Sequence, residues 1–137
     1  MSPQLTNQSQ PPKNLPLTLT VSVLEAYEGR TPPPGSRGHY PVGNAVVRLR
    51  MENLSQQPVA LTIASVKITS LSGQPVLMEK AVGQVELGGL QIQESGLRLT
   101  NEQGFSHHQT IQAIVTYSYQ GKTFTVTSPG FDVSVFH

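Results

Sequence analysis

The sequence predicts an all-β protein, a single two-layered sandwich of about seven to nine short antiparallel strands. Three observations support this prediction. Apolar residues alternate with polar ones in run after run, which is the two-residue period of a strand with one buried face. Turn-forming residues separate these runs, and Thr, Val and aromatic residues are enriched within them. No segment shows the 3.6-residue apolar period of an amphipathic helix.

Composition limits the domain count and the classes of partner. The 137 residues fit one domain, and their lack of cysteine excludes disulfides, thiolate metal sites and a cysteine nucleophile. The net charge is +1, and the nine basic and eight acidic residues are spread along the chain without blocks. Nucleic acids and anionic membranes favour a clustered basic face, so the sequence predicts neither as a partner.

The first residues predict a flexible polar tail without a targeting signal. Residues 1–14 are rich in Gln, Asn, Ser and Pro and too poor in apolar side chains to repay the entropy of ordering. They lack the basic and apolar regions of a secretory signal, and no stretch approaches the roughly 18 apolar residues of a membrane span. We therefore expect a sandwich domain over residues 15–137 and no membrane span. A cytoplasmic location is the default, with a secreted or periplasmic one left open.

The first two predicted strands each have one apolar face. Residues 15–23 carry Leu or Val at every odd position, and residues 45–52 carry Ala, Val, Leu and Met in the same way. In the second strand Arg48, Arg50 and Glu52 point away from the apolar face. These charges indicate a solvated strand face, or an edge strand that charge protects from unwanted pairing.

The third predicted strand contains a break in its period. Alternation runs on odd positions from Val59 to Ile63 and continues on even positions from Val66. A slip of one residue would turn every later side chain to the opposite face. We therefore expect a β-bulge, or a crossing from one sheet to the other, near Ala64.

The middle of the chain shows weaker strand signals. A turn is expected at residues 72–75, and a weak strand at residues 82–87. Residues 90–100 alternate again, with a predicted break at residues 94–96, and "NEQG" at 101–104 is another turn.

The clearest signal is a hairpin near the carboxyl end. Residues 111–119 and 122–126 alternate on either side of Gln120-Gly121, and two residues ending in Gly are typical of a tight hairpin turn. Ser, Pro and Gly then end this unit, and residues 131–135 form the last predicted strand.

The hairpin turn after the second strand carries a resemblance. A strand closed by "ENLSQQPV", residues 52–59, and followed by another strand resembles the hairpins of bacterial immunoglobulin-like and fibronectin-like modules. The resemblance covers residues 15–137 at the level of architecture and implies an immunoglobulin-like β-sandwich. The paired cysteines and core tryptophan of antibody domains are missing, so no functional residue is carried over. Other sandwiches and a partly open barrel remain alternatives.

The motifs predict neither an enzyme nor a cofactor. Nucleophile elbows, phosphate loops and the usual zinc spacings of histidine are absent. His107 and His108 are adjacent, so on a strand they would point to opposite faces unless a turn reorients them. Glu25 and Glu28 would give only a weak calcium site. No metal site is predicted.

The best candidate for a partner-binding site is the loop "GRTPPPGSRGHYPVG", residues 29–43. About fifteen residues without secondary structure make an unusually long link, and such loops are usually functional or disordered. Arg30, Arg37, His39 and Tyr40 are groups suited to a carboxylate or to another protein's surface. The alternative is that the loop only spans the two sheets.

A second candidate surface is the predicted hairpin with Tyr117, Tyr119, Lys122 and Phe124. Because the tyrosines share the parity of Val115, core packing with hydroxyls that reach the rim is the expected arrangement.

Two functions remain after these exclusions. The first is a non-catalytic protein-binding or assembly module that uses loops or an edge strand, with another protein or a second copy as partner. The second is a domain that binds a small ligand, either a carbohydrate or a metal ion.

Overall fold

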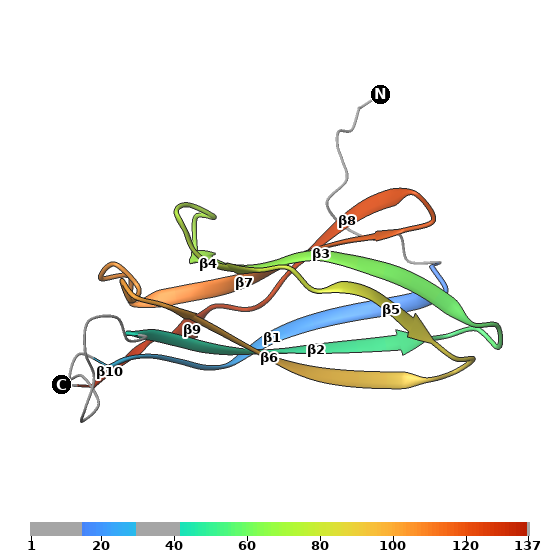
Figure 1. Cartoon of the computed structure of the whole chain (residues 1–137), viewed down its shortest axis with the longest axis horizontal. Coiled ribbons are helices and arrows are strands. Elements are labelled where there is room, and N and C mark those ends of the chain that lie inside the picture. The colour runs from blue at the N-terminus through green and yellow to red at the C-terminus, as the bar shows by residue number, and fades with distance from the viewer. Residues whose placement is uncertain (1–14, 30–41, 137) are drawn as a thin grey trace.

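Two β-sheets pack face to face in the computed structural model, which describes residues 15–29 and 42–136 (Figure 1). One sheet has four strands in the order β10-β1-β2-β6. The other has six, in the order β4-β3-β7-β8 with β5 also beside β3 and β9 beside β7. No helix occurs in these ranges, and so none that could cross a membrane. The predicted all-β sandwich is confirmed.

The ten strands have the following bounds in chain order: β1 (Leu17–Gly29), β2 (Gly43–Asn53), β3 (Val59–Ser70), β4 (Val76–Lys80), β5 (Gly83–Leu87), β6 (Ile92–Asn101), β7 (Thr110–Tyr119), β8 (Lys122–Thr127), β9 (Phe131–Asp132) and β10 (Ser134–Phe136).

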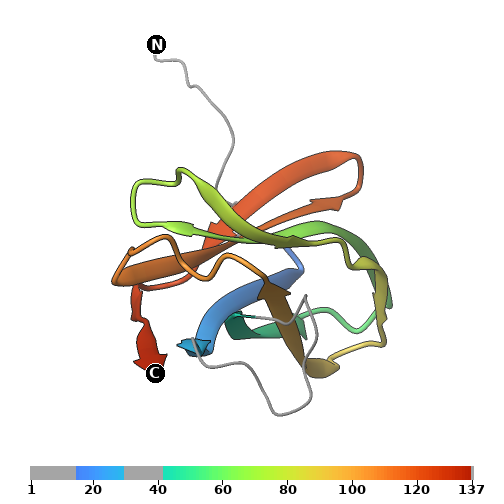
Figure 2. The same ribbon diagram turned by 60° about the vertical axis from the view of Figure 1, so that its left-hand side comes forward.

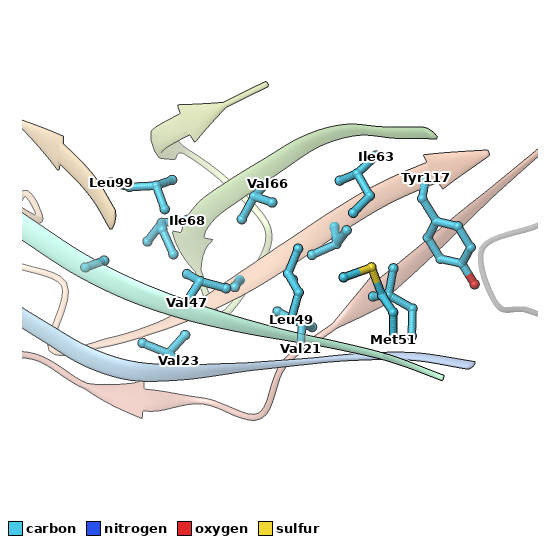
Figure 3. Close-up of a cluster of buried hydrophobic side chains, with 14 of the residues drawn as sticks. Val21, Val23, Val47, Leu49, Met51, Ile63, Val66, Ile68, Leu99 and Tyr117 are labelled. Atoms are coloured by element: carbon cyan, nitrogen blue, oxygen red, sulfur yellow. The ribbon is translucent and has the colours of Figure 1, made fainter. Parts of the chain in front are cut away.

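The interior lies between the two sheets, as Figure 2 shows from the side. Every second residue of β2 and β7 is buried, and the same alternation runs on either side of the bulges in β1 and β3 until β3 ends in three buried residues. In Figure 3, Val21, Val47 and Leu49 of one sheet face Val66, Ile68 and Tyr117 of the other. The burial of these apolar side chains is the main favourable contribution to folding.

β2 is the central strand of the four-stranded sheet. It pairs with β1 on one side and β6 on the other, so the alternative that its charges guard an edge is wrong. Its charged side chains lie on the solvated face, where Arg50 contacts Glu52 at 3.2 Å and Glu94 at 3.3 Å.

The bulge predicted near Ala64 is confirmed. The pairing of β3 with β7 shifts register between Ile63 and Ser65. The other side of β3 changes partner at the same point: β5 pairs with the residues up to Ile63, and β4 pairs from Val66 onwards. The apolar residues of β3 change from odd to even positions at the bulge, and the extra residue of the bulge keeps both sets on the core face.

The predicted β7–β8 hairpin is also confirmed. Gln120 and Gly121 connect the strands with φ angles of 54° and 79°. Positive φ at both central residues is the type I′ geometry, whose twist matches that of the flanking strands.

The middle of the chain differs from the strand predictions at three points. β6 runs without a break through residues 94–96, because its backbone pairing with β2 continues where Gly96 faces Arg48. Leu90, expected at the start of that strand, lies exposed in the preceding turn with φ of 60°. β4 was not predicted, since Met78 is its only buried side chain. Edge strands of this kind have too few buried side chains for a clear period.

The first and last strands also differ from expectation. β1 continues from the alternating run at residues 15–23 to Gly29, past a register shift between Val23 and Glu25 that the sequence did not indicate. The last predicted strand is two short ones: β9 pairs antiparallel with β7, and β10 pairs parallel with β1. The chain therefore crosses from one sheet to the other near Val133. This division, together with β4, accounts for ten strands where about seven to nine were expected.

A buried amide organises the loops at the end of the sandwich where β2 meets β3. Asn53 is 1% exposed, and its side-chain nitrogen donates hydrogen bonds to the carbonyl oxygens of Gln57 and Gly88, at 2.8 Å each. Its side-chain oxygen accepts one from the backbone amide of Ser55 at 2.9 Å. Nearby, a Cβ on Gly89 would lie 2.3 Å from the carbonyl oxygen of Gln56, so only glycine fits there.

Candidate functional site

The four predicted partner-binding residues, Arg30, Arg37, His39 and Tyr40, lie outside the described residues. So does the tail predicted over residues 1–14. The described ends of the long loop meet: the amide of Gly29 donates to the carbonyl oxygen of Val42 at 2.9 Å. The loop therefore leaves and re-enters the sandwich at one point.

The adjacent histidines lie in the turn between β6 and β7. His107 has φ of 66°, and both histidines line a cavity of about 250 Å³ with Glu28. Glu28 is only 6% exposed, and its carboxylate accepts a hydrogen bond from the backbone amide of Phe105 at 2.8 Å. That bond ties β1 to the turn. In the described part of the chain, no three His, Asp or Glu side chains are grouped so that they could hold a metal ion.

The tyrosines of the hairpin belong to the core. Tyr117, Tyr119 and Phe124 are buried, and the rings of Tyr117 and Phe124 lie 5.5 Å apart between centroids. Core packing is confirmed, whereas the expectation that both hydroxyls reach the rim is wrong for Tyr117. Its hydroxyl is buried and has no hydrogen-bond partner among the described residues, and desolvation raises its pKa above the usual value. Of the four side chains in this candidate surface, only Lys122 is exposed.

The first half of β1 forms an open edge of the four-stranded sheet. The amide of Leu54 donates a hydrogen bond to the carbonyl oxygen of Pro16. In an antiparallel pair, hydrogen-bonded and non-bonded residue pairs alternate along the strand. The even-numbered residues of β1 before the bulge are therefore the ones that are hydrogen-bonded to β2. The amides and carbonyls of the odd-numbered residues in Leu17–Val23 then point away from β2. β10 pairs with β1 only from Tyr27, and no other described strand pairs on that side. We call Leu17–Val23 the open edge.

The open edge lacks the features that usually protect an edge strand. Its sequence is "LTLTVSV", with no charge, no proline and no bulge before Leu24. Four of the other outer strands carry exposed charges: Glu94 and Arg98 in β6, Glu79 and Lys80 in β4, Glu86 in β5 and Lys122 in β8, whereas the three-residue β10 carries none. An uncharged edge is a template for pairing with another chain, and the open edge is a run of seven residues with this property.

A cavity lies where the open edge ends. It measures about 390 Å³ and is lined by Leu24, Glu25, Ala26, Tyr27, Phe131, Asp132 and Ser134. These residues come from the bulged part of β1 and from the crossing between β9 and β10. Leu24 is 47% exposed there, so part of its apolar side chain is open to a ligand. We call this the corner cavity.

The sequence predicted binding through loops or an edge strand, but it indicated neither that this edge is the first half of β1 nor that a cavity lies beside it. The signal was the uncharged run "LTLTVSV", but a central strand can carry the same pattern. Only the pairing of strands distant in the sequence shows that this one is an edge.

Comparisons with known proteins support the class of fold. No protein-family model matches the chain, and no curated protein matches it. The crystal structure of a FixG-related protein from Vibrio parahaemolyticus is similar, with a TM-score of 0.52 over 86% of this chain and 96% of that chain. The two sequences are 12% identical, so the likeness concerns the fold alone. The described residues thus form a two-sheet β-sandwich in which the first half of β1 is an uncharged edge.

Proposed function

We propose that this protein is a non-catalytic binding module that accepts an extended strand of another polypeptide at the open edge of β1. The observation that carries the proposal is that the odd-numbered residues of Leu17–Val23, on an uncharged stretch of strand, have no backbone pairing partner among the described strands. Strand addition of this kind is a recurring mode of peptide recognition, in which main-chain hydrogen bonds supply affinity.

The energetics favour a modest affinity from the backbone alone. The odd-numbered residues of the open edge offer four amides and four carbonyls. A protein hydrogen bond contributes about 0.5–1.5 kcal/mol net, and association costs roughly 4–15 kcal/mol. Side-chain contacts beyond the edge are therefore needed for tight and selective binding.

The connectivity supports an immunoglobulin-like assignment within the proposal. In such domains the first, second and fifth strands share one sheet, and the third, sixth and seventh share the other. β1, β2 and β6 would correspond to the first set, and β3, β7 and β8 to the second. β4 and β5 would then form the variable outer connection.

The test is a peptide selection on the full chain. Short random peptides are selected for binding, and their affinity is measured for a variant with Thr20→Lys and Ser22→Lys. These side chains lie outside the core on the solvated face, opposite Arg50 and Arg48, so the substitutions place charge on the edge, and circular dichroism confirms that each variant is folded before affinities are compared. The matched control is Ala60→Lys with Thr62→Lys on β3, where β5 pairs with both positions and β7 also pairs with Thr62.

We expect the edge variant to lose at least about tenfold in affinity and the control to lose little. Self-association of the wild type that only the edge variant abolishes would support the same mode with a second copy as partner. Equal affinities for both variants, or a selection without peptides from a chain that stays monomeric, would contradict the proposal.

A further inference from the structure

We infer that the strand accepted at the open edge carries a basic side chain, arginine or lysine, that enters the corner cavity. The inference rests on the proposed function, because it identifies the chemistry of the partner that the edge selects.

The corner cavity lies in line with the open edge. The edge ends at Val23, the register shift follows directly, and the cavity begins at Leu24. β10 takes over the pairing only from Tyr27. A strand advances about 3.3 Å per residue, so an added strand that continues past Val23 brings its next side chains to the cavity mouth. The bulge also bends β1 here, as bulges beside binding sites commonly do.

The walls of the cavity are apolar and acidic. Leu24, Ala26 and Phe131 supply apolar surface, whereas Glu25 and Asp132 supply two carboxylates. None of the seven lining residues is basic. Both carboxylates belong to exposed residues, so a ligand can reach them without displacing the core.

Asp132 keeps capacity for a further partner. Its Oδ1 accepts a hydrogen bond from the hydroxyl of Thr110 at 3.0 Å, which fixes the carboxylate beside the cavity. An ionised carboxylate has about four acceptor positions, so one bond leaves room for a cationic donor. The contact with Thr110 therefore orients the group and does not saturate it.

A basic side chain matches both parts of this lining. Lysine and arginine combine an apolar stem with a cationic end, so the stem can cover Leu24 and Phe131 while the head meets the carboxylates. A neutral apolar side chain would desolvate the carboxylates without compensation, and an acidic one would be repelled. Charge complementarity therefore selects a cation over the alternatives.

The experiment uses a blocked host peptide of alternating Thr and Val, with one position at a time replaced by arginine, norleucine or glutamate. Affinities are measured by fluorescence anisotropy at low and physiological salt. We expect one position at which arginine binds about tenfold tighter than norleucine, with glutamate weakest. Salt should reduce this preference, because the carboxylates are exposed.

Two double variants locate the preference. The first variant combines Glu25→Gln with Asp132→Asn. It should lose the preference for arginine, because the amide side chains keep the shape of the two carboxylates but carry no charge. The second variant combines Glu79→Gln with Glu86→Gln, which makes the same change of charge on β4 and β5 at the opposite edge of the molecule. It should keep the preference for arginine.

The outcomes separate the two claims. Peptides bind at the edge if the variant with Thr20→Lys and Ser22→Lys no longer binds them. If such peptides show no preference for arginine at any position, the inference is overturned and the proposed function stands. A preference that both double variants reduce equally would also overturn the inference, since the effect would then come from net charge. If no host peptide binds, neither claim holds.

Discussion

The buried hydroxyl of Tyr117 gives the sharpest prediction about stability. The side chain is fully buried, and its oxygen has no hydrogen-bond partner among the described residues. A buried polar group without a partner costs about 1–3 kcal/mol. Tyr117→Phe removes the oxygen and keeps the ring against Phe124. We expect the free energy of unfolding to rise by about 1–2 kcal/mol, and each kcal/mol shifts the Tm of a domain of this size by about 3–5 °C.

The pH dependence supplies a second signature of the same hydroxyl. Desolvation raises the pKa of Tyr117 in the folded state above the ordinary value of 10.0. Below pH 10 the folded and unfolded states both hold the proton. Above it the unfolded state releases the proton first, so the wild type loses stability as pH rises through the folded pKa. The advantage of Tyr117→Phe over the wild type should therefore widen above about pH 10.

Urea denaturation followed by circular dichroism measures these free energies. Tyr119→Phe is the matched control, because among the described residues the buried hydroxyl without a partner is that of Tyr117. This substitution should change the free energy of unfolding by no more than about 0.5 kcal/mol. Tyr117→Ala should instead destabilise by about 3–5 kcal/mol, because it leaves a cavity in the core. A loss of about 1 kcal/mol or more for Tyr117→Phe would refute the reasoning, since it would show that the hydroxyl is satisfied in solution.

Three further predictions concern loops and strands and use the same denaturation assay. Asn53→Ala should cost about 2–4 kcal/mol, because it leaves buried backbone groups without partners; a loss under 0.5 kcal/mol would contradict this role. Gly89→Ala should destabilise by about 1–3 kcal/mol through the clash with Gln56, whereas Gly96→Ala, with nothing within 4 Å of its Cβ, should be neutral or slightly stabilising. Gln120→Asn should stabilise by a few tenths of a kcal/mol, since Asn-Gly suits a type I′ turn; a clear loss would argue against that turn.

The sequence was most informative where one strand face is fully buried. The bulge in β3 followed from a change of parity between Ile63 and Val66, because both halves of that strand contact the core. The β7–β8 hairpin followed from alternation on both sides of a turn that ends in glycine. In these elements local pattern and tertiary burial agree, so the pattern is sufficient.

The sequence was least informative at edges and crossings. β4 buries one side chain, and β9 and β10 together are too short to show a period, so their existence depends on long-range pairing. The same limit applies to the binding site. Whether Leu17–Val23 is central or open depends on which strands flank it, and the corner cavity requires β9 and β10 to cross beside Leu24. The four residues expected to bind a partner lie outside the described structure and stay a prediction.

The most direct test of the open edge is amide hydrogen exchange of the monomeric full chain, measured by NMR. The amides of Thr18, Thr20 and Ser22 should exchange slowly because they are bonded to β2. Those of Leu17, Leu19, Val21 and Val23 should exchange quickly because they face solvent. Slow exchange at both sets in the monomer would show that the edge is already paired, and would contradict the account.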